Sequence, residues 1–211
     1  MSRDFTDPQR AGLLRVVQAL KAANLATTSL DAPEETLRAL AEQAEALVAA
    51  MKPSCRPDGQ WPFAPFSSDP IDLPFSPVSG RYNPTSPQSV LTTEGSDPKR
   101  VVALVRFSKL YEGPPTFVHG GWIAAMFDQL LGVSNHANQA GGLTASLTIQ
   151  YKRPTPIDTD LRFVAWPERV DERKVLTRGQ CFAGDELLTE CEGVFVRMDA
   201  LRARRIFGSK A

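Results

Sequence analysis

The chain has no surplus of charge of either sign, because 24 lysines and arginines balance 24 aspartates and glutamates among its 211 residues. A nucleic-acid binder needs a basic surface that displaces counterions from phosphates, and a protein that lies on a lipid surface needs a basic helix face. The composition therefore argues against both classes of partner. It is typical of a globular protein of one or two domains.

Cysteine is scarce, and long apolar runs are missing. Cys55, Cys181 and Cys191 are odd in number and lack the spacing of a disulfide framework or a metal site, which favours a reduced, intracellular protein. The N-terminus lacks the apolar core of a signal peptide, and no stretch reaches the roughly 18 apolar residues of a membrane span. We therefore expect a cytoplasmic protein without a membrane span.

Histidine is rarer still, and the motifs of several common enzyme classes are absent. The two histidines, His119 and His136, are about 25 Å apart along a continuous helix, so they cannot share a metal within one chain. No GxSxG, P-loop, GxGxxG or HExxH sequence occurs. We expect no metal, and serine-hydrolase, nucleotide-binding and zinc-protease chemistry have no support.

The first third of the chain predicts two amphipathic helices. Apolar residues recur with the helical period over positions 13–24 and again over positions 37–51. Asp7-Pro8 marks a start for the first helix, and Asp31 with Glu34 resembles an acidic capping box at the start of the second. Two such helices joined by a short polar link form a helical hairpin.

Residues 53–87 are rich in proline and hold nine of the 17 prolines. Proline removes backbone donors and fixes φ, so no long helix or central strand runs through this segment. Disordered linkers are poor in aromatic residues. This segment holds Trp61, Phe63, Phe66, Phe75 and Tyr82. We expect an ordered strap on the main domain, which either covers a ligand channel or only packs on the surface.

The second half of the chain predicts strands around one helix. Five stretches have the length or the alternation of strands: residues 100–107, 143–151, 160–170, 173–182 and 187–198. Turn signals at Asp171-Glu172 and Gly184-Asp185 separate the last three. Strands so close in sequence pair antiparallel, because a parallel crossover needs a dozen or more residues. We predict an α+β domain with one antiparallel sheet and one helix.

The predicted helix that follows His119 carries a carboxylate in an apolar stretch. Positions 122–127 are all apolar, which predicts a buried helix, yet Asp128 comes next. An ionised carboxylate is costly to bury unless it is paired. Asp128 is therefore either a functional group or part of a narrow solvent-facing stripe.

Gly120 and Gly121 stand at the start of this helix, where backbone N–H groups have no helical partner and the helix dipole is positive. Glycine lets a ligand approach the backbone closely, so the pair suits an oxyanion in acyl transfer, although it also fits a tight turn. Gly120 lies about 12 Å from Asp128 along the helix axis, too far for one carbonyl to touch both. A site that uses both residues needs a second subunit, as in a two-fold dimer.

Two runs, VHGGWIAAMFDQLLG and GGLTASLTIQYKRPTP, resemble the hotdog-fold acyl-CoA thioesterases, specifically their PaaI-like and THEM4-like branch. The resemblance rests on the patterns HGG-x6-D and T-x6-Y-x-R-P and covers residues 78–198. It implies a hotdog domain, in which an antiparallel sheet wraps around a central helix, and sites formed in a homodimer or a dimer of dimers. Residues 1–77 then form a helical and proline-rich extension, and residues 199–211 form a basic tail.

The resemblance also implies a role for each motif residue. The N–H of Gly120, with or without that of Gly121, polarises the thioester carbonyl, and Asp128 is the nucleophile or the general base for water. Thr144 orients the water or the carboxylate, and His119 either binds the thioester sulfur or fixes its own loop. Some relatives carry an amide side chain just before the histidine. Positions 111–116 have none, so Thr116 or His119 would replace it.

The implied substrate is an acyl-CoA, so coenzyme A is part of the substrate and no separate cofactor is expected. Its phosphates need local cations, for which Lys152 and Arg153 are the first candidates. Weaker candidates are Arg178, Arg202, Arg204 and Arg205. Two alternatives stay open: a non-catalytic protein that binds acyl-CoA or another lipid, and a hotdog hydratase or dehydratase, which fits less well.

Overall fold

A computed structural model describes residues 6–56, 69 and 71–197 of the chain. The chain divides into two compact units, Met1–Pro65 and Phe66–Ala211. Some residues singled out in the sequence lie outside the described residues: Trp61, Phe63, Phe66, Arg202, Arg204, Arg205 and the remainder of the basic tail 199–211.

The first unit contains the two predicted helices. α1 (Asp7–Thr27) begins where Asp7-Pro8 indicates a start, and the backbone N–H of Thr6 donates to Gln9 Oε1 at 2.9 Å in the first turn. α2 (Glu34–Met51) follows and runs into the short 3₁₀ turn η1 (Lys52–Ser54). The predicted helical pair is thus confirmed, with bounds a few residues wider than the apolar stripes.

The capping box expected at the start of α2 is wrong. The N-cap position is Pro33, so Asp31 stands two residues too early, and no side chain of the described residues caps the first turn. Proline offers no side-chain acceptor, and Glu34 and Glu35 instead place negative charge at the positive end of the helix dipole. In the described part of the chain, no helix combines the length and the hydropathy that a membrane span requires.

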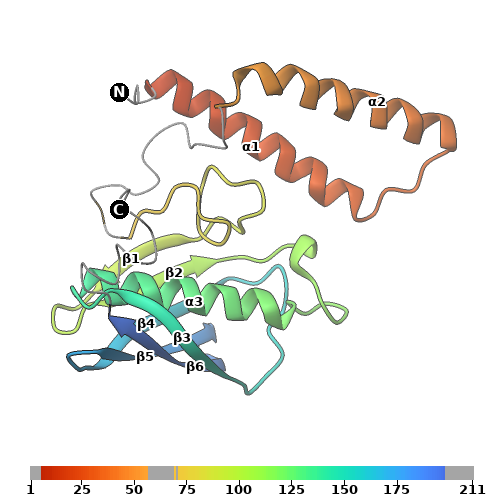
Figure 1. Cartoon of the computed structure of the whole chain (residues 1–211). Coiled ribbons are helices and arrows are strands. Elements are labelled where there is room, and N and C mark those ends of the chain that lie inside the picture. The colour runs from red at the N-terminus through yellow and green to blue at the C-terminus, as the bar shows by residue number, and fades with distance from the viewer. Residues whose placement is uncertain (1–5, 57–68, 70, 198–211) are drawn as a thin grey trace. The chain divides into compact units, whose positions relative to one another are not determined.

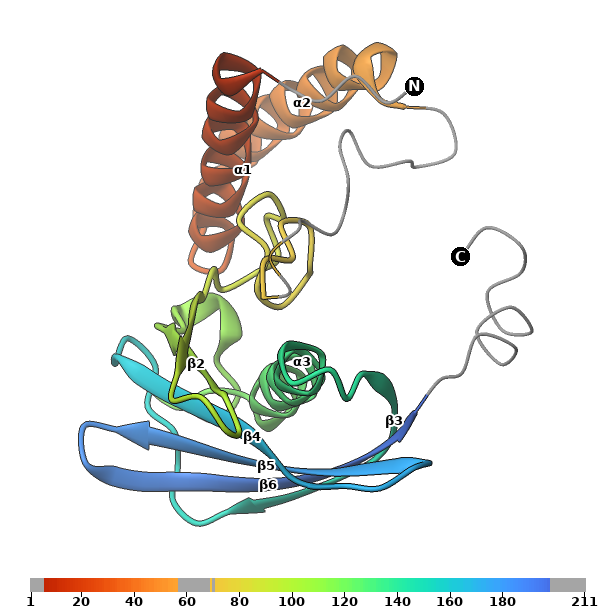
Figure 2. The same ribbon diagram turned by 90° about the vertical axis from the view of Figure 1, so that its left-hand side faces the viewer.

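The second unit is built on one antiparallel sheet of six strands in the order β1-β2-β4-β5-β6-β3. The strands are β1 (Val90–Glu94), β2 (Arg100–Val105), β3 (Gly142–Tyr151), β4 (Leu161–Val170), β5 (Lys174–Ala183) and β6 (Glu186–Arg197). The sequence predicts all of them except β1, which is short and follows the proline-rich segment. Figures 1 and 2 show the sheet curving around α3 (Gly120–Ala137).

One side of α3 supplies the centre of the core. The residues on this side are at most 2% exposed and include Ile123, Met126, Phe127, Leu130 and Leu131. Phe127 meets Phe163 of β4 edge to face, with the ring centroids 5.1 Å apart. The opposite side is not buried within one chain, since Gly121 and Asp128 are exposed. The single chain therefore places Asp128 on a solvent-facing stripe.

Two glycines of the sheet let α3 lie close to it. A Cβ added to Gly179 of β5 would lie 2.8 Å from Phe127 Cδ1, and a Cβ added to Gly193 of β6 would lie 2.6 Å from Leu131 Cδ2. Real Cβ atoms do not approach other atoms so closely, so both positions need a residue without a side chain. The absence of a side chain at these two positions lets α3 pack closely on β5 and β6.

The described part of the proline-rich segment packs on the core of the second unit. Its residues Ile71, Leu73 and Val78 contact the core cluster. Ser76 Oγ donates to Gln129 Oε1 on α3 at 2.7 Å, and the hydroxyl of Tyr111 donates to the carbonyl of Thr85 at 3.0 Å. The segment is thus bonded directly to the residue that follows Asp128.

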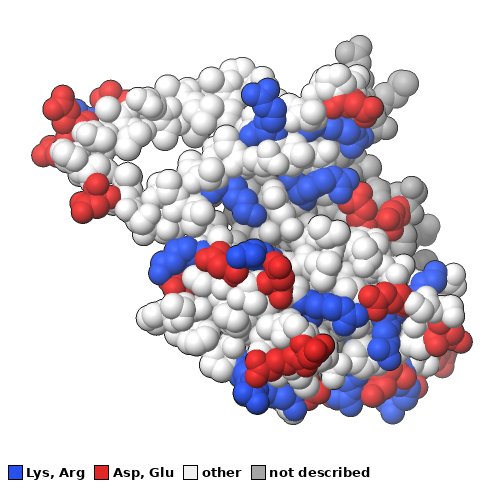
Figure 3. All heavy atoms as spheres, turned by 180° about the vertical axis from the view of Figure 1, so that it is seen from behind, with Lys and Arg blue, Asp and Glu red and all other residues white. Residues whose placement is uncertain are grey.

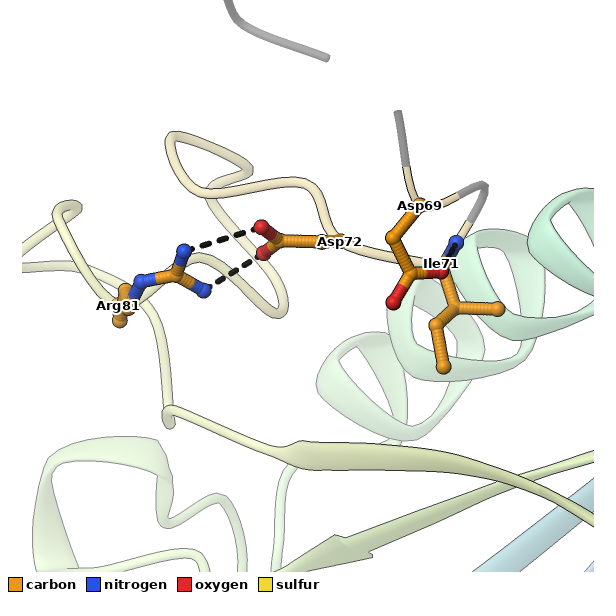
Figure 4. Close-up of polar contacts among 4 residues, drawn as sticks. All are labelled: Asp69, Ile71, Asp72 and Arg81. Atoms are coloured by element: carbon orange, nitrogen blue, oxygen red, sulfur yellow. Dashed lines mark hydrogen bonds and ion pairs between the residues drawn. The ribbon is translucent and has the colours of Figure 1, made fainter. Parts of the chain in front are cut away.

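An ion pair closes this segment on itself. Figure 4 shows the two terminal guanidinium nitrogens of Arg81 directed at the carboxylate of Asp72. The N···O distances are 2.6 and 3.0 Å. The two residues are nine positions apart, so the pair ties off a loop that contains Ser76. Bidentate pairing fixes geometry more strictly than a single contact does.

Candidate active site

The first turn of α3 is held by hydrogen bonds from two directions. His119 is the N-cap residue, and its Nδ1 accepts the N–H of Gly121 at 2.9 Å. The hydroxyl of Tyr151, at the end of β3, donates to the carbonyl of Gly120 at 2.9 Å. The peptide group between the two glycines therefore has its N–H and its C=O both bound.

The N–H of Gly120 is different, because it has no hydrogen-bond partner within the described part of the chain. Gly120 is the first residue of α3, so its N–H lies at the positive end of the helix dipole. The N–H of Gly121 is already bound to His119, so only one of the two predicted donors is free for a ligand.

His119 fixes its own turn, which is one of the two roles that the resemblance implies. A neutral imidazole that accepts at Nδ1 carries its proton on Nε2. The turn therefore leaves His119 with one N–H that is not used in the cap. His119 is exposed and directly precedes Gly120 in the sequence.

A cleft of about 620 Å³ opens at this end of the helix. Its lining is mostly apolar and includes Pro114, Phe117, Val118, Gly120, Gly121, Ile123, Tyr151, Lys152, Arg153, Pro154 and Thr155. Four predicted site residues, the two glycines and the two cations, thus line one cleft. Asp128 and Thr144 do not line it.

The two predicted cations each have an acidic partner. Lys152 Nζ lies 2.8 Å from Glu190 Oε2, and Arg153 Nε lies 2.9 Å from Glu186 Oε1. The hydrogen bond from Lys152, followed by that from Gln180, lowers the pKa of Glu190. All four charged side chains are well exposed, and exposed ion pairs are weak, so a phosphate can take the place of either carboxylate.

The weaker candidate Arg178 lies elsewhere. It bridges Glu168 and Glu192 and lines a separate groove together with Trp166 and residues of β3, β5 and β6. Figure 3 shows basic and acidic side chains interspersed over the lower part of the face that it presents, without a broad patch of one sign. This mixing matches the neutral composition and argues against a phosphate-binding role for Arg178.

Asp128 and Thr144 meet on the exposed side of α3. Thr144 Oγ1 donates to Asp128 Oδ1 at 2.7 Å, so the predicted partnership of these two residues has a direct geometric basis. Thr144 stands at a register shift between β3 and β6, where Ala145 is the extra residue. The strict alternation of residues 143–151 is therefore broken by a bulge beside Asp128.

Cys191 lies in the same region and is a buried thiol. Burial raises its pKa to about 12, and the charges of Asp128 and Glu192 add to the rise. Burial alone raises the pKa of Cys181 to about 12. Both thiols stay protonated at neutral pH, which agrees with their interpretation as core residues and not as nucleophiles.

Thr116 does not line the cleft, although it precedes His119 by three residues. Its φ of 70° is unusual for a β-branched residue. The carboxylate of Glu112 accepts its N–H at 2.7 Å, and its carbonyl accepts the N–H of Ile157 at 3.0 Å. In the described residues the strained turn therefore shapes the loop rather than supplying a side chain to the cleft.

Comparison with known proteins finds one family with a similar sequence. Residues 116–190 match the model of the thioesterase superfamily, a stretch that contains the glycine pair, Asp128 and Tyr151. This segment is similar to the thioesterase superfamily. A crystal structure of a thioesterase superfamily protein superimposes on the chain with a TM-score of 0.78 at 27% identity, covering 87% of this chain and 94% of that one. The predicted hotdog fold is confirmed.

Curated thioesterase relatives match about half of the chain. Acyl-coenzyme A thioesterase THEM4 of Xenopus laevis is 35% identical over 102 residues, which are 47% of this chain and 46% of that protein. The protein of the same name from Bos taurus is 31% identical over 110 residues, which are 50% and 44% of the two chains. The chain thus spans less than half the length of these relatives.

Proposed function

We propose that the chain hydrolyses acyl-CoA thioesters to a free acid and coenzyme A. The observation that carries the proposal is the N–H of Gly120, which has no hydrogen-bond partner among the described residues. Gly120 lines a mostly apolar cleft together with the cations Lys152 and Arg153. The match of residues 116–190 to the thioesterase superfamily and the names of the THEM4 relatives support the same reaction. The reaction needs no separate cofactor, since coenzyme A enters with the substrate.

In the proposed mechanism, Gly120 stabilises the oxyanion. Its N–H donates to the thioester oxygen, and this bond strengthens as negative charge develops there. The positive end of the α3 dipole acts in the same direction. His119 presents its Nε2–H next to Gly120 and donates to the sulfur, where charge accumulates as the C–S bond breaks.

Asp128 activates the attack. As general base it takes a proton from water while the water oxygen bonds to the carbonyl carbon, and the C–S bond then breaks and the thiolate of coenzyme A receives the proton. As nucleophile it forms a mixed anhydride that water hydrolyses in a second step. In both routes Thr144 holds Oδ1 and leaves Oδ2 for the reaction.

We propose that each site draws Gly120 and Asp128 from different subunits. The two residues lie about 12 Å apart along one helix, and Asp128 does not line the cleft at Gly120. β3 is an edge strand of the sheet, and it carries Thr144 next to the exposed side of α3. A two-fold dimer that joins these surfaces brings the Asp128 of one copy to the cleft of the other.

The oxyanion role is tested by Gly120→Pro with Gly120→Ala as its matched control. Proline at the first helical position suits the helix but has no N–H, whereas alanine keeps the N–H and adds the same Cβ. His119 has φ −60° and ψ 129°, which tolerates a following proline. Release of thiol from acyl-CoAs of several chain lengths should fall about 10²- to 10³-fold for Gly120→Pro. Equal activity of the two variants would overturn the role of Gly120.

The role of Asp128 is tested with Asp128→Asn. This change keeps the shape of the side chain, and Asp160→Asn serves as control because that side chain is 90% exposed and outside the cleft. We expect thiol release to be lost in the first variant and kept in the second. If the wild type releases no thiol from any chain length, hydrolysis is refuted and a binding role is favoured.

The shared site is tested by mixing the two inactive variants. After subunit exchange, a mixed dimer of Gly120→Pro and Asp128→Asn chains has one intact site and one doubly altered site. Random exchange should restore about a quarter of the wild-type activity. Exchange without any recovery would place both residues in a site of one chain.

A further inference from the structure

Tyr151 belongs to the T-x6-Y-x-R-P pattern but has no role in the chemistry described so far. It is the last residue of β3, and its hydroxyl bonds the carbonyl of Gly120, 31 positions earlier. A Cβ on Gly120 would lie 3.3 Å from Tyr151 Oη and 3.4 Å from Cζ, so the ring contacts the first turn of α3 directly. Tyr151 also lines the cleft.

The hydroxyl of Tyr151 is a donor at neutral pH. Burial, followed by the neighbouring Cys191, raises the pKa of Tyr151 above its ordinary value, so the phenol stays protonated. The carbonyl of Gly120 accepts a helical N–H by its position, and its second lone pair is available for Tyr151. The end of β3 and the first turn of α3 are thus joined by a hydrogen bond in which Tyr151 is the donor.

Tyr151, the peptide group between Gly120 and Gly121, and the His119 ring form a series of hydrogen bonds, each group donating to the next. Tyr151 donates to the carbonyl of Gly120, the N–H of the same peptide group donates to His119 Nδ1, and the proton of the neutral ring is therefore on Nε2. An amide that accepts at its oxygen becomes a better donor at its nitrogen, and hydrogen bonds in such chains strengthen one another. This series of hydrogen bonds ends at the ring Nε2–H of His119. The backbone N–H of Gly120, which has no partner among the described residues, lies next to it in the sequence.

We propose that Tyr151 is a positioning residue that acts through the peptide group between Gly120 and Gly121 to hold His119 as an Nε2–H donor. The inference rests on the proposed thioester hydrolysis for its effect on rate, but the state of His119 does not depend on that reaction. Glycine on both sides makes this peptide group free to rotate, so it needs fixing from outside the helix. Tyr151 supplies that fixing at the carbonyl, and His119 supplies it at the N–H.

The direct test is ¹⁵N NMR of the imidazole rings in the full chain. Only two histidines are present, so His136→Gln assigns the signals of His119. We expect the wild type to show the Nε2–H form at neutral pH and Tyr151→Phe to show mixed forms. Tyr111→Phe is the matched control, since its hydroxyl also bonds a backbone carbonyl but lies outside the cleft.

Kinetics supply the second readout. Tyr151→Phe keeps the ring in the cleft, so we expect KM to change little while kcat falls up to about tenfold, and we expect Tyr111→Phe to match the wild type. Unchanged ¹⁵N signals in Tyr151→Phe would overturn the proposal, whatever happens to kcat. A wild type that shows the expected ¹⁵N response but releases no thiol would refute the proposed hydrolysis and leave the positioning role intact.

Discussion

At the scale of single residues, the three cysteines differ in exposure. Cys55 is exposed, whereas Cys181 and Cys191 are buried with pKa values of about 12. The thiolate is the reactive form, and a pKa of 12 leaves a fraction of only about 10⁻⁴ as thiolate at pH 8. Burial and protonation thus both protect Cys181 and Cys191 from reaction with thiol reagents.

We therefore predict that a thiol reagent at pH 8 modifies one cysteine of the native protein quickly and the other two only on unfolding. Cys55→Ser should remove the fast phase. Reaction of Cys191 in the native chain would contradict the environment of Asp128 described above, because the charge of Asp128 helps to raise the pKa of that thiol.

The hydrogen bonds at Gly120 and Gly121 could not be predicted from the sequence. The glycine pair, Asp128 and Thr144 carry a pattern that predicts where the chemistry lies. The pattern does not distinguish the two glycine N–H groups, because the His119 ring accepts only that of Gly121. It also does not show that Tyr151 bonds the carbonyl of Gly120. A hydrogen bond between residues 31 positions apart has no local signal.

At the scale of elements, the packing of α3 on the sheet depends on two glycines. A Cβ on Gly179 would lie 2.8 Å from both Leu131 Cδ1 and Phe127 Cδ1, whose side chains are 0% exposed and have no room to move. Overpacking of this kind costs about 1–3 kcal/mol. The sequence contains these glycines, but only the fold places them under the helix.

We predict that Gly179→Ala lowers the free energy of unfolding by about 1–3 kcal/mol in urea denaturation. Gly12→Ala is the matched control, because it sits inside α1 and, beyond the adjacent backbone, no atom of the described residues lies within 4 Å of an added Cβ. That variant should stabilise α1 by about 0.5–1 kcal/mol. Equal effects of the two changes would show that α3 can shift away from β5.

Elements with strong periodicity are predictable, and others are not. The runs that become β4, β5 and β6 end within one or two residues of their predicted bounds, because each pairs with its sequence neighbour through a short turn. β1 has five residues, is mostly exposed and, among the described strands, pairs with β2 alone. Its pairing depends on the position of β2, which no local pattern describes.

At the scale of the whole molecule, the described core belongs to the second unit. Among the described residues, the core cluster and the apolar residues packed against it all lie beyond position 70. The proline-rich segment contributes Ile71, Leu73 and Val78 to it. The second unit therefore has the buried apolar surface that independent folding requires.

We predict that a chain of residues 66–211 keeps its cooperative thermal transition by circular dichroism. Removal of residues 1–89 should lower the midpoint, because it also removes the apolar contacts of the segment and the bond from Ser76 to Gln129. Loss of the transition in the longer fragment would mean that the first unit is needed for the fold of the second.

The sequence by itself determined the balance of charge, the helices and most strands of this protein, and the pairing of a glycine-led helix with one carboxylate. These follow from composition and from periodicities that act over a few residues. The tertiary structure alone decided which glycine N–H stays free, that Thr144 meets Asp128, and that Tyr151 holds the first turn of α3. The contacts of Thr144 and Tyr151 depend on β3 lying beside α3, and such contacts between distant residues arise only when the sheet wraps around the helix.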